Sequence, residues 1–366
     1  MNLMEGQDND EQSTESKCSE SKCSDVQGDI ITKVDHNFNL VNKSNLEAWE
    51  KTRPKGYIKY RERWNNAPID KLLEKFPIHL DVEATSHCNL LCTMCPRTDM
   101  VNDGSFWKIE HTDFELYKRL IDEGVTKGLC SVKFNYLGEP LMNRELFKWI
   151  AYAKEKGVID VMFNTNATML NETNARKIIA SGLDKLFFSF DSPDKEHYEK
   201  IRVNGKFERT FSNIVRFHEI REEMNSSTPY TRVSMVRMKE NEHECEKFVQ
   251  LFENIVDSVG ICEYLDHTSQ NHGNNKNSSF RKMSRNTFCC PQLWQRMFVH
   301  PDGLVTPCCN DSARSLIMGN IHENNVEDIW LGEKYMELRE LHATGRIQEV
   351  DTCSKCALAN LALMEQ

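Results

Sequence analysis

From residue 77 onward, the chain alternates short apolar runs with longer stretches in which apolar residues recur at helical spacing. Six runs have the length and composition of strands, and they cover 78–83, 131–136, 158–163, 185–190, 231–238 and 260–265. The stretches between them have a helical period, and they cover 113–123, 144–156, 172–181, 211–223 and 242–257. Strands that alternate with helices form parallel sheets with the helices outside. The pattern predicts an α/β fold, a parallel sheet curled into a full or partial barrel.

The segments outside this pattern differ from it in composition. The N-terminal stretch carries eight acidic residues, two basic ones and no aromatic one, which predicts a disordered tail. The aromatic residues that follow predict helices that pack on the barrel, and a run rich in Asn predicts a polar linker after it. The expected order is tail, helical lead-in, barrel, linker and a second, smaller module, at 1–30, 31–76, 77–266, 267–286 and 287–366.

Composition and charge exclude several classes of protein. The net charge of −10 argues against a nucleic-acid binder, which would carry a basic face. No apolar run approaches the length of a membrane helix, and the acidic N-terminus does not resemble a signal peptide. The expectation is a soluble, cytoplasmic protein without a nucleic-acid or membrane partner. In such a compartment its 14 cysteines indicate metal rather than disulfides.

Three of these cysteines follow the first expected strand. Cys88, Cys92 and Cys95 lie within eight residues, at the strand end where barrel enzymes place their chemistry. Three thiolates can ligate three irons of a cubane cluster and leave the fourth iron open, as a catalytic centre requires. A structural zinc site would need a fourth ligand, and the adjacent His87 is badly placed to chelate the same ion as Cys88.

This spacing after the first strand resembles the signature of the radical S-adenosylmethionine (SAM) superfamily, although Met94 stands where an aromatic residue is common. The resemblance implies a partial (βα)6 barrel and a [4Fe-4S] cluster. It also implies that SAM binds the open iron and is cleaved to a 5′-deoxyadenosyl radical, which removes hydrogen from a C–H bond. A flavodoxin or ferredoxin would supply the electron.

Further matches to the superfamily lie on successive strand ends. Their expected role, implied by the resemblance, is to contact SAM through its amino group, ribose and carboxylate. These residues are Gly138, Glu139, Pro140, Asn166, Ser189, Asp191 and Arg202.

The C-terminal module carries a second set of cysteines. Four thiolates suffice for a fully ligated cluster, and the expected turn at Asp302-Gly303 would bring the first two together. Gly303 and the four-residue gap to the next cysteine resemble the SPASM and twitch families, which hold auxiliary [4Fe-4S] clusters. The expected ligands are Cys290, Cys308, Cys353 and Cys356. The adjacent Cys289 and Cys309 remain alternatives, and a four-cysteine zinc site remains open.

An auxiliary cluster beside a radical site offers an electron acceptor for oxidising an alcohol. The cysteine layout resembles that of 2-deoxy-scyllo-inosamine dehydrogenase-type enzymes. The first hypothesis is therefore a dehydrogenase acting on a sugar, cyclitol or nucleotide-linked sugar. Candidate bases or substrate contacts are Glu263, His267, Arg296 and His300.

Three other functions remain open. An epimerase would return hydrogen to the substrate from a thiol, for which Cys262 and Cys309 are candidates. A peptide or protein maturase would need a recognition domain, which the lead-in does not resemble. An iron–sulfur carrier would have no need for the residues that match SAM contacts.

Overall fold

The computed structural model describes residues 38–264 and 289–356. The expected tail, the expected linker and His267 lie outside the described residues. The strands are β1 (Phe38–Val41), β2 (His79–Val82), β3 (Leu91–Cys92), β4 (Ser131–Lys133), β5 (Asp160–Thr165), β6 (Lys185–Ser189), β7 (Arg202–Val203), β8 (Tyr230–Arg237), β9 (Ser258–Glu263), β10 (Arg296–Val299), β11 (Leu304–Thr306) and β12 (Gly319–Asn320).

The α-helices number thirteen within these ranges. They are α1 (Lys43–Lys51), α2 (Lys55–Asn66), α3 (Pro96–Asn102), α4 (Phe114–Lys127), α5 (Leu146–Glu155), α6 (Glu172–Ala180), α7 (Lys195–Ile201), α8 (Phe207–Glu223), α9 (Cys245–Phe252), α10 (Gln292–Gln295), α11 (Val326–Trp330), α12 (Glu333–Ala343) and α13 (Asp351–Ser354). Short 3-10 turns lie at η1 (Pro140–Met142), η2 (Glu242–Glu244) and η4 (Ile347–Glu349). None of the helices in the described ranges combines the length and apolarity needed to cross a bilayer.

The six predicted strands form the centre of the sheet, in the parallel order β9-β8-β6-β5-β4-β2. Along β8, Val233 and Met235 are fully buried toward the helices, whereas Arg232 and Ser234 lie on the other face and are half-buried. This period of two gives the strands an apolar outer face and a polar inner face. The partial barrel predicted from the sequence is confirmed, although β5 begins and ends two residues later than expected.

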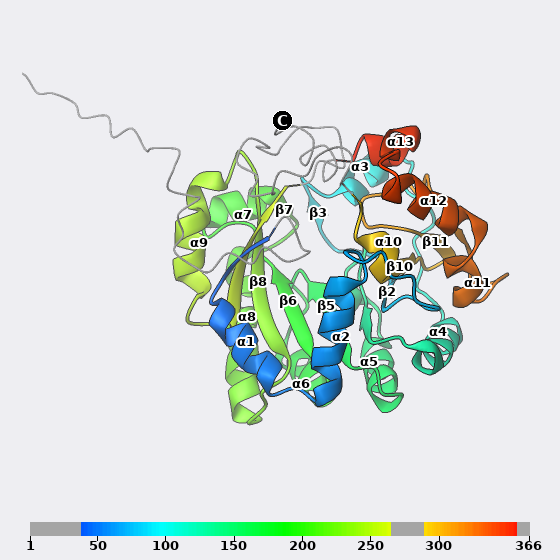
Figure 1. Cartoon of the computed structure of the whole chain (residues 1–366). Helices are drawn as coiled ribbons and strands as arrows, with labels where there is room; N and C mark the ends of the chain where they lie inside the picture. Colours follow the sequence, from blue (N-terminus) through cyan, green and yellow to red (C-terminus); the bar gives the residue numbers. More distant parts are fainter. Residues whose placement is uncertain (1–37, 265–288, 357–366) are drawn as a thin grey trace, which may run out of the picture.

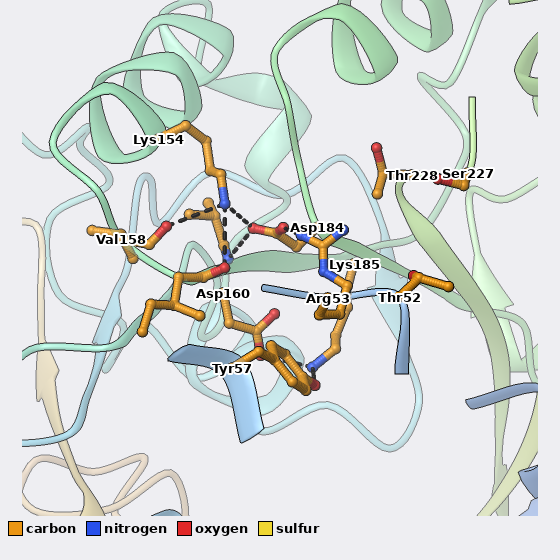
Figure 2. Close-up of polar contacts among 12 residues, drawn as sticks. Thr52, Arg53, Tyr57, Lys154, Val158, Asp160, Asp184, Lys185, Ser227 and Thr228 are labelled. Carbon is orange, nitrogen blue, oxygen red and sulfur yellow. Dashed lines mark hydrogen bonds and ion pairs between the residues drawn. The ribbon is translucent and has the colours of Figure 1, made fainter. Parts of the chain in front are cut away.

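The lead-in helices α1 and α2 lie against the inner face of the sheet (Figure 1). Asp184 directly precedes β6, at the end of the barrel where the parallel strands begin, and its carboxylate contacts three other residues. It forms an ion pair with Arg53, lies 2.6 Å from Nζ of Lys154 and accepts a 2.9 Å hydrogen bond from the Val161 N–H (Figure 2). The strand β1, which the sequence analysis missed, pairs antiparallel with β9 and extends the sheet at that edge.

Lys185 provides a second attachment for the lead-in. Its Nζ lies 2.6 Å from Oδ2 of Asp160 and donates a 2.7 Å hydrogen bond to the Tyr57 hydroxyl (Figure 2). These contacts fix α2 to the inner face of β5 and β6.

The C-terminal module continues the sheet at its other edge. Strand β10 pairs parallel with β2, and β11 and β12 follow antiparallel. The expected hairpin at Asp302-Gly303 is confirmed between β10 and β11. Gly303 has φ +83°, a left-handed backbone conformation in which other residues are strained. The hairpin of β10 and β11 therefore lies beside β2, the first strand of the barrel. The sequence did not predict the parallel pairing of β10 with β2.

Candidate active site

The first three cysteines form a compact group above the end of β2. Cys92 lies in β3, which pairs with β7 so that it stands opposite Arg202, and the Cys95 N–H donates a 3.1 Å hydrogen bond to the Cys92 carbonyl. Burial raises the pKa of Cys88 to about 11 and that of Cys92 to about 12, with smaller contributions from the other thiols. Thiolates here need a cationic partner, which iron would supply. The donor set therefore fits a three-cysteine iron–sulfur cluster.

His87 does not join this group. Its ring stacks on the ring of His111, with centroids 4.6 Å apart. This arrangement supports the view that His87 is not a fourth ligand.

Asn89, inside the cysteine loop, ties that loop to the end of β5. Its Oδ1 accepts a 3.0 Å hydrogen bond from Nδ2 of Asn166, and its Nδ2 donates a 2.8 Å bond to the Thr168 hydroxyl. Asn166 in turn holds Thr168 through its own Oδ1. Sequence reasoning missed Asn89 because a loop asparagine gives no signal until its partner is known.

The Gly138-Glu139-Pro140 segment packs directly on the chain that leaves β2. A Cβ at Gly138 would lie 1.8 Å from the Thr85 carbonyl oxygen, so no other residue fits. The Glu139 carboxylate accepts hydrogen bonds from the Thr165 hydroxyl and the Asn166 N–H, each at 2.7 Å. Burial raises the pKa of Glu139 despite these donors. Oε1 also accepts a 3.2 Å hydrogen bond from the Leu141 N–H, so Oε2 is the oxygen with a further lone pair that could hold an ammonium group.

Arg202 and Asp191 form a buried ion pair beside Cys92. Nε of Arg202 lies 2.6 Å from Oδ2 of Asp191, whose other oxygen accepts a 2.8 Å hydrogen bond from the Val236 N–H. Burial opposes the charge of Arg202, but Asp191 and Cys92 outweigh it and raise the pKa of the guanidinium. The arginine is therefore a fixed cation at the rim of the cysteine group. Ser189 ends β6 beside these residues, level with Ser234 of β8.

The four cysteines expected to hold the auxiliary cluster converge. They line one small cavity in the C-terminal module, and they are Cys290, Cys308, Cys353 and Cys356. Burial raises the pKa of Cys353 to about 12, and Cys356 acts in the same direction. Cys289 and Cys309 do not line this cavity. The set fits either a fully ligated iron–sulfur cluster or zinc.

His342 is an additional residue of this cavity that the cysteine pattern could not indicate. The Cys290 N–H donates to its Nδ1 at 3.3 Å, so Nε2 carries the ring proton and lies 3.4 Å from the Cys353 sulfur. Asn310 donates to the Cys356 sulfur at 3.3 Å. The sulfurs of Cys353 and Cys356, two of the expected cluster ligands, therefore each have a side-chain hydrogen-bond donor.

Glu83, Tyr136 and His300 form a buried group that holds the Gly138 loop and lies near Cys308 of the second cysteine set. Oε2 of Glu83 is 3.5 Å from Nδ1 of His300, and the side chains of both residues are 1% exposed. Neither atom has a hydrogen-bond partner among the described residues, and the same is true of the Tyr136 hydroxyl. The Tyr136 and His300 rings are 5.2 Å apart. Burial raises the pKa of Tyr136, and the neighbouring Cys308 thiol adds to this effect.

His300 was a candidate from the sequence, whereas Glu83 and Tyr136 were missed. Glu83 closes the first apolar strand, and a carboxylate at that place was a visible signal. Its other oxygen accepts hydrogen bonds from the N–H groups of Leu137 and Gly138, at 2.9 and 3.0 Å. One carboxylate thus fixes the glycine loop and faces His300.

The other candidates have different neighbours, apart from Cys309, whose thiol adds to the raised pKa of Tyr136. Glu263 is ion-paired with Arg237, and burial raises the pKa of its carboxyl. Cys262 and Arg296 line a cavity on the inner face of the barrel. Gln292 lies 3.7 Å from the sulfur of Cys309, which is exposed.

The family models match both parts of this arrangement. The model of the radical SAM superfamily matches residues 82–252, and the SPASM model, an iron–sulfur cluster-binding domain, matches residues 289–357. The chain belongs to the radical SAM superfamily. It is a radical SAM enzyme, its cofactors are SAM and a [4Fe-4S] cluster, and its SPASM domain implies an auxiliary iron–sulfur cluster.

Three relatives show how far the likeness extends. The AdoMet-dependent heme synthase of Nitratidesulfovibrio vulgaris is 30% identical over 45% of this chain, but only 44% of that enzyme is matched. The SAM-dependent 2-deoxy-scyllo-inosamine dehydrogenase of Niallia circulans is 22% identical over 81% of this chain and 98% of its own length. The structure of Streptococcus suis SuiB with S-adenosylmethionine superposes with a TM-score of 0.59 at 13% identity, covering 84% of this chain and 76% of SuiB. The last likeness shows the radical SAM fold.

Proposed function

We propose that this radical SAM enzyme is a dehydrogenase that oxidises a secondary alcohol of a sugar, cyclitol or nucleotide-linked sugar to a carbonyl. The observation that carries the proposal is the buried group of Glu83, Tyr136 and His300, which holds the Gly138 loop and lies near Cys308. The group places two buried atoms that can accept a proton, Oε2 of Glu83 and Nδ1 of His300, where a substrate could contact both cysteine sets. The match along nearly the whole length of the inosamine dehydrogenase supports the same reaction type.

The proposed ligands follow from the geometry. Cys88, Cys92 and Cys95 hold the first cluster, and the four cysteines around the C-terminal cavity hold the auxiliary one. When bound, SAM and the first cluster supply a hydrogen-abstracting radical, and the auxiliary cluster supplies an electron acceptor. A flavodoxin or ferredoxin supplies the electron that starts each turnover.

The remaining step, loss of the hydroxyl proton, is assigned to this chain's own residues. A carbinol that has lost its C–H hydrogen becomes a carbonyl when it also loses the O–H proton and one electron. His300 accepts that proton at Nδ1, and Glu83 stabilises the charge that forms, because its Oε2 lies 3.5 Å away. Arg202 and Glu139 orient SAM through its carboxylate and its amino group.

The test is turnover with a panel of sugars, cyclitols and nucleotide-linked sugars, using anaerobically reconstituted enzyme, SAM and dithionite. We expect one substrate to yield a carbonyl product two mass units lighter, in equal amount to 5′-deoxyadenosine. His300→Asn should slow carbonyl formation by roughly 100-fold or more. His218→Asn, on the outer helix α8, serves as the matched control and should leave the rate unchanged. Redox-neutral products across the panel would contradict the proposal.

A second candidate, an epimerase, rests on one observation. Cys262 is half-buried and lines the inner cavity of the barrel, where its thiol could return hydrogen to a substrate radical. In deuterium oxide, an epimerase would put one deuterium on the product carbon. The Cys262→Ala variant would then form 5′-deoxyadenosine without turning over the substrate. The control variant Cys289→Ala would still turn the substrate over.

A further inference from the structure

Two histidines and one glutamate form a cluster outside the sites described above. His197 lies in α7, and His243 and Glu244 lie in the 3-10 turn η2, which leads from β8 into α9. Each of the three side chains offers one ligand atom, and these atoms all lie within 4.8 Å of one another. Two imidazole nitrogens and a carboxylate oxygen are a ligand set that zinc takes in sites with three protein ligands.

Both histidines face the same oxygen of the glutamate. Nδ1 of His197 lies 2.5 Å from Oε1 of Glu244, and Nε2 of His243 lies 3.9 Å from it. Ligand atoms bound to one tetrahedral zinc ion at about 2.0–2.1 Å are about 3.3 Å apart, a value between these two distances. The side chains of His197 and His243 are 43% and 63% exposed, so their rings have room to rotate onto a common ion.

The carboxylate of Glu244 is buried and held in place. Its side chain is 5% exposed, and Oε2 accepts a 2.7 Å hydrogen bond from the Ser192 hydroxyl. Within the described part of the chain, its ion-pair partners are His197 and His243. A buried carboxylate needs a cation beside it. Two protonated histidines would repel each other there, whereas one zinc ion binds both as neutral ligands.

The backbones of both ligand-bearing segments are fixed by other contacts. Nδ2 of the buried Asn241 donates a 2.8 Å hydrogen bond to the Asp191 carbonyl, and Oδ1 accepts a 2.7 Å bond from the Met238 N–H. In α7, the carboxylate of Asp194 accepts a 3.0 Å hydrogen bond from the His197 N–H. These contacts hold η2 and the start of α7 in place, which lowers the cost of ordering the ligands around an ion.

The cluster adjoins the segment that carries the proposed SAM contacts. Ser192, which supports the Glu244 carboxylate, directly follows Asp191, the ion-pair partner of Arg202. A metal ion that joins α7 to η2 would therefore brace the chain on which Asp191 lies.

We propose that His197, His243 and Glu244 bind a zinc ion, with the Ser192 hydroxyl supporting the carboxylate and a water molecule as the fourth ligand. This site is separate from both cysteine sets and does not depend on the proposed dehydrogenase reaction. Its two nitrogen ligands favour zinc over magnesium and calcium, which take oxygen ligands.

The test is calorimetric titration of anaerobically reconstituted, desalted holoenzyme with zinc chloride, and with magnesium chloride for comparison. We expect about one zinc per chain to bind at micromolar concentrations and magnesium not to bind. His243→Ala and Glu244→Gln should each weaken zinc binding roughly tenfold or more. The control His218→Ala removes a histidine that lies 3.3 Å from Glu222 on α8 and should leave zinc binding unchanged.

X-ray absorption identifies the ligands of the added zinc. The spectrum is taken as the difference from the untreated holoenzyme, so that zinc already held by cysteines is subtracted. We expect nitrogen and oxygen at about 2.0–2.1 Å and no sulfur at about 2.3 Å. Because the His243 side chain is largely exposed, His243→Ala stays informative if Glu244→Gln does not fold. No zinc binding, sulfur around the added zinc, or unchanged zinc affinity in either folded variant overturns the inference.

Discussion

The carboxylate of Glu83 lies 3.5 Å from Nδ1 of His300, across the boundary between the barrel and the SPASM domain. The two residues meet because β10 adds to the sheet parallel to β2, and the Glu83 N–H donates a 2.9 Å hydrogen bond to the carbonyl of Val299. The second Glu83 oxygen holds the loop that contains Gly138. A single side chain therefore joins the proposed SAM loop to the proposed proton acceptor.

Replacing Glu83 in two ways separates these roles. Glu83→Gln keeps an oxygen that accepts from Leu137 and Gly138, whereas Glu83→Ala leaves both N–H groups without an acceptor. Each buried unsatisfied donor costs about 1–3 kcal/mol, so the alanine variant should bind SAM roughly tenfold or more weakly. The glutamine variant should bind SAM as the wild type does and lose carbonyl formation. Calorimetry measures the SAM affinity of both variants, and product analysis measures carbonyl formation by the glutamine variant. Equal SAM affinity in the wild type and both variants would contradict the assignment.

The Asp191–Arg202 pair predicts a specific loss of SAM binding. Asp191→Asn leaves the guanidinium buried beside Cys92 without a carboxylate, which typically costs about 3–5 kcal/mol for a buried pair. We expect SAM affinity to fall at least tenfold and the melting temperature to drop. Asp257→Asn removes the comparable Arg221 pair, far along the sheet from the cysteines, and should lower the melting temperature alone. Equal effects of the two variants on SAM affinity would show that the pair acts only on stability.

Gly138 should not tolerate any side chain. A Cβ there would overlap the Thr85 carbonyl oxygen, so Gly138→Ala must displace the loop that carries Glu139. We expect the variant to keep its iron and lose SAM binding. Gly56→Ala is the matched control, because its Cβ would meet only Ile159 at an ordinary 3.6 Å. Retention of wild-type SAM affinity by Gly138→Ala would remove this loop from the site.

The choice between adjacent cysteines can be settled by iron content. Cys308 lines the C-terminal cavity and Cys309 does not, so Cys308→Ala should lose up to about four irons per chain and Cys309→Ala none. The Cys290 and Cys289 pair should behave in the same way. Iron loss from Cys309→Ala with retention in Cys308→Ala would shift the ligand register by one residue.

Local patterns were sufficient for much of this molecule. The positions of the six strands followed from periodicity, which is a property of short segments, whereas the choice of Cys290 and Cys308 over their neighbours stays a prediction. The pairing of β10 with β2 and of β3 with β7 could not be predicted, because it depends on contacts between residues far apart in the chain. The same reason explains why Asn89 and His342 were missed.

The cavity on the inner face could not be predicted either. Lys133 and Arg232 both line it, but they stood out little among 46 Lys and Arg residues, and only the barrel brings them together. Polar residues on different strands can be assigned to one cavity only when the strand register shows that they lie on the same face of the sheet.

The most direct measurement is iron, sulfide and zinc per chain after anaerobic reconstitution, in the wild type and in the Cys88/Cys92/Cys95→Ala variant. Two cubane clusters predict about eight irons in the wild type and about four in the variant, with no zinc. This result would establish the auxiliary cluster that the proposed oxidation needs as its electron acceptor. About four irons and one zinc in the wild type, with all iron lost in the variant, would contradict it and make the C-terminal site structural.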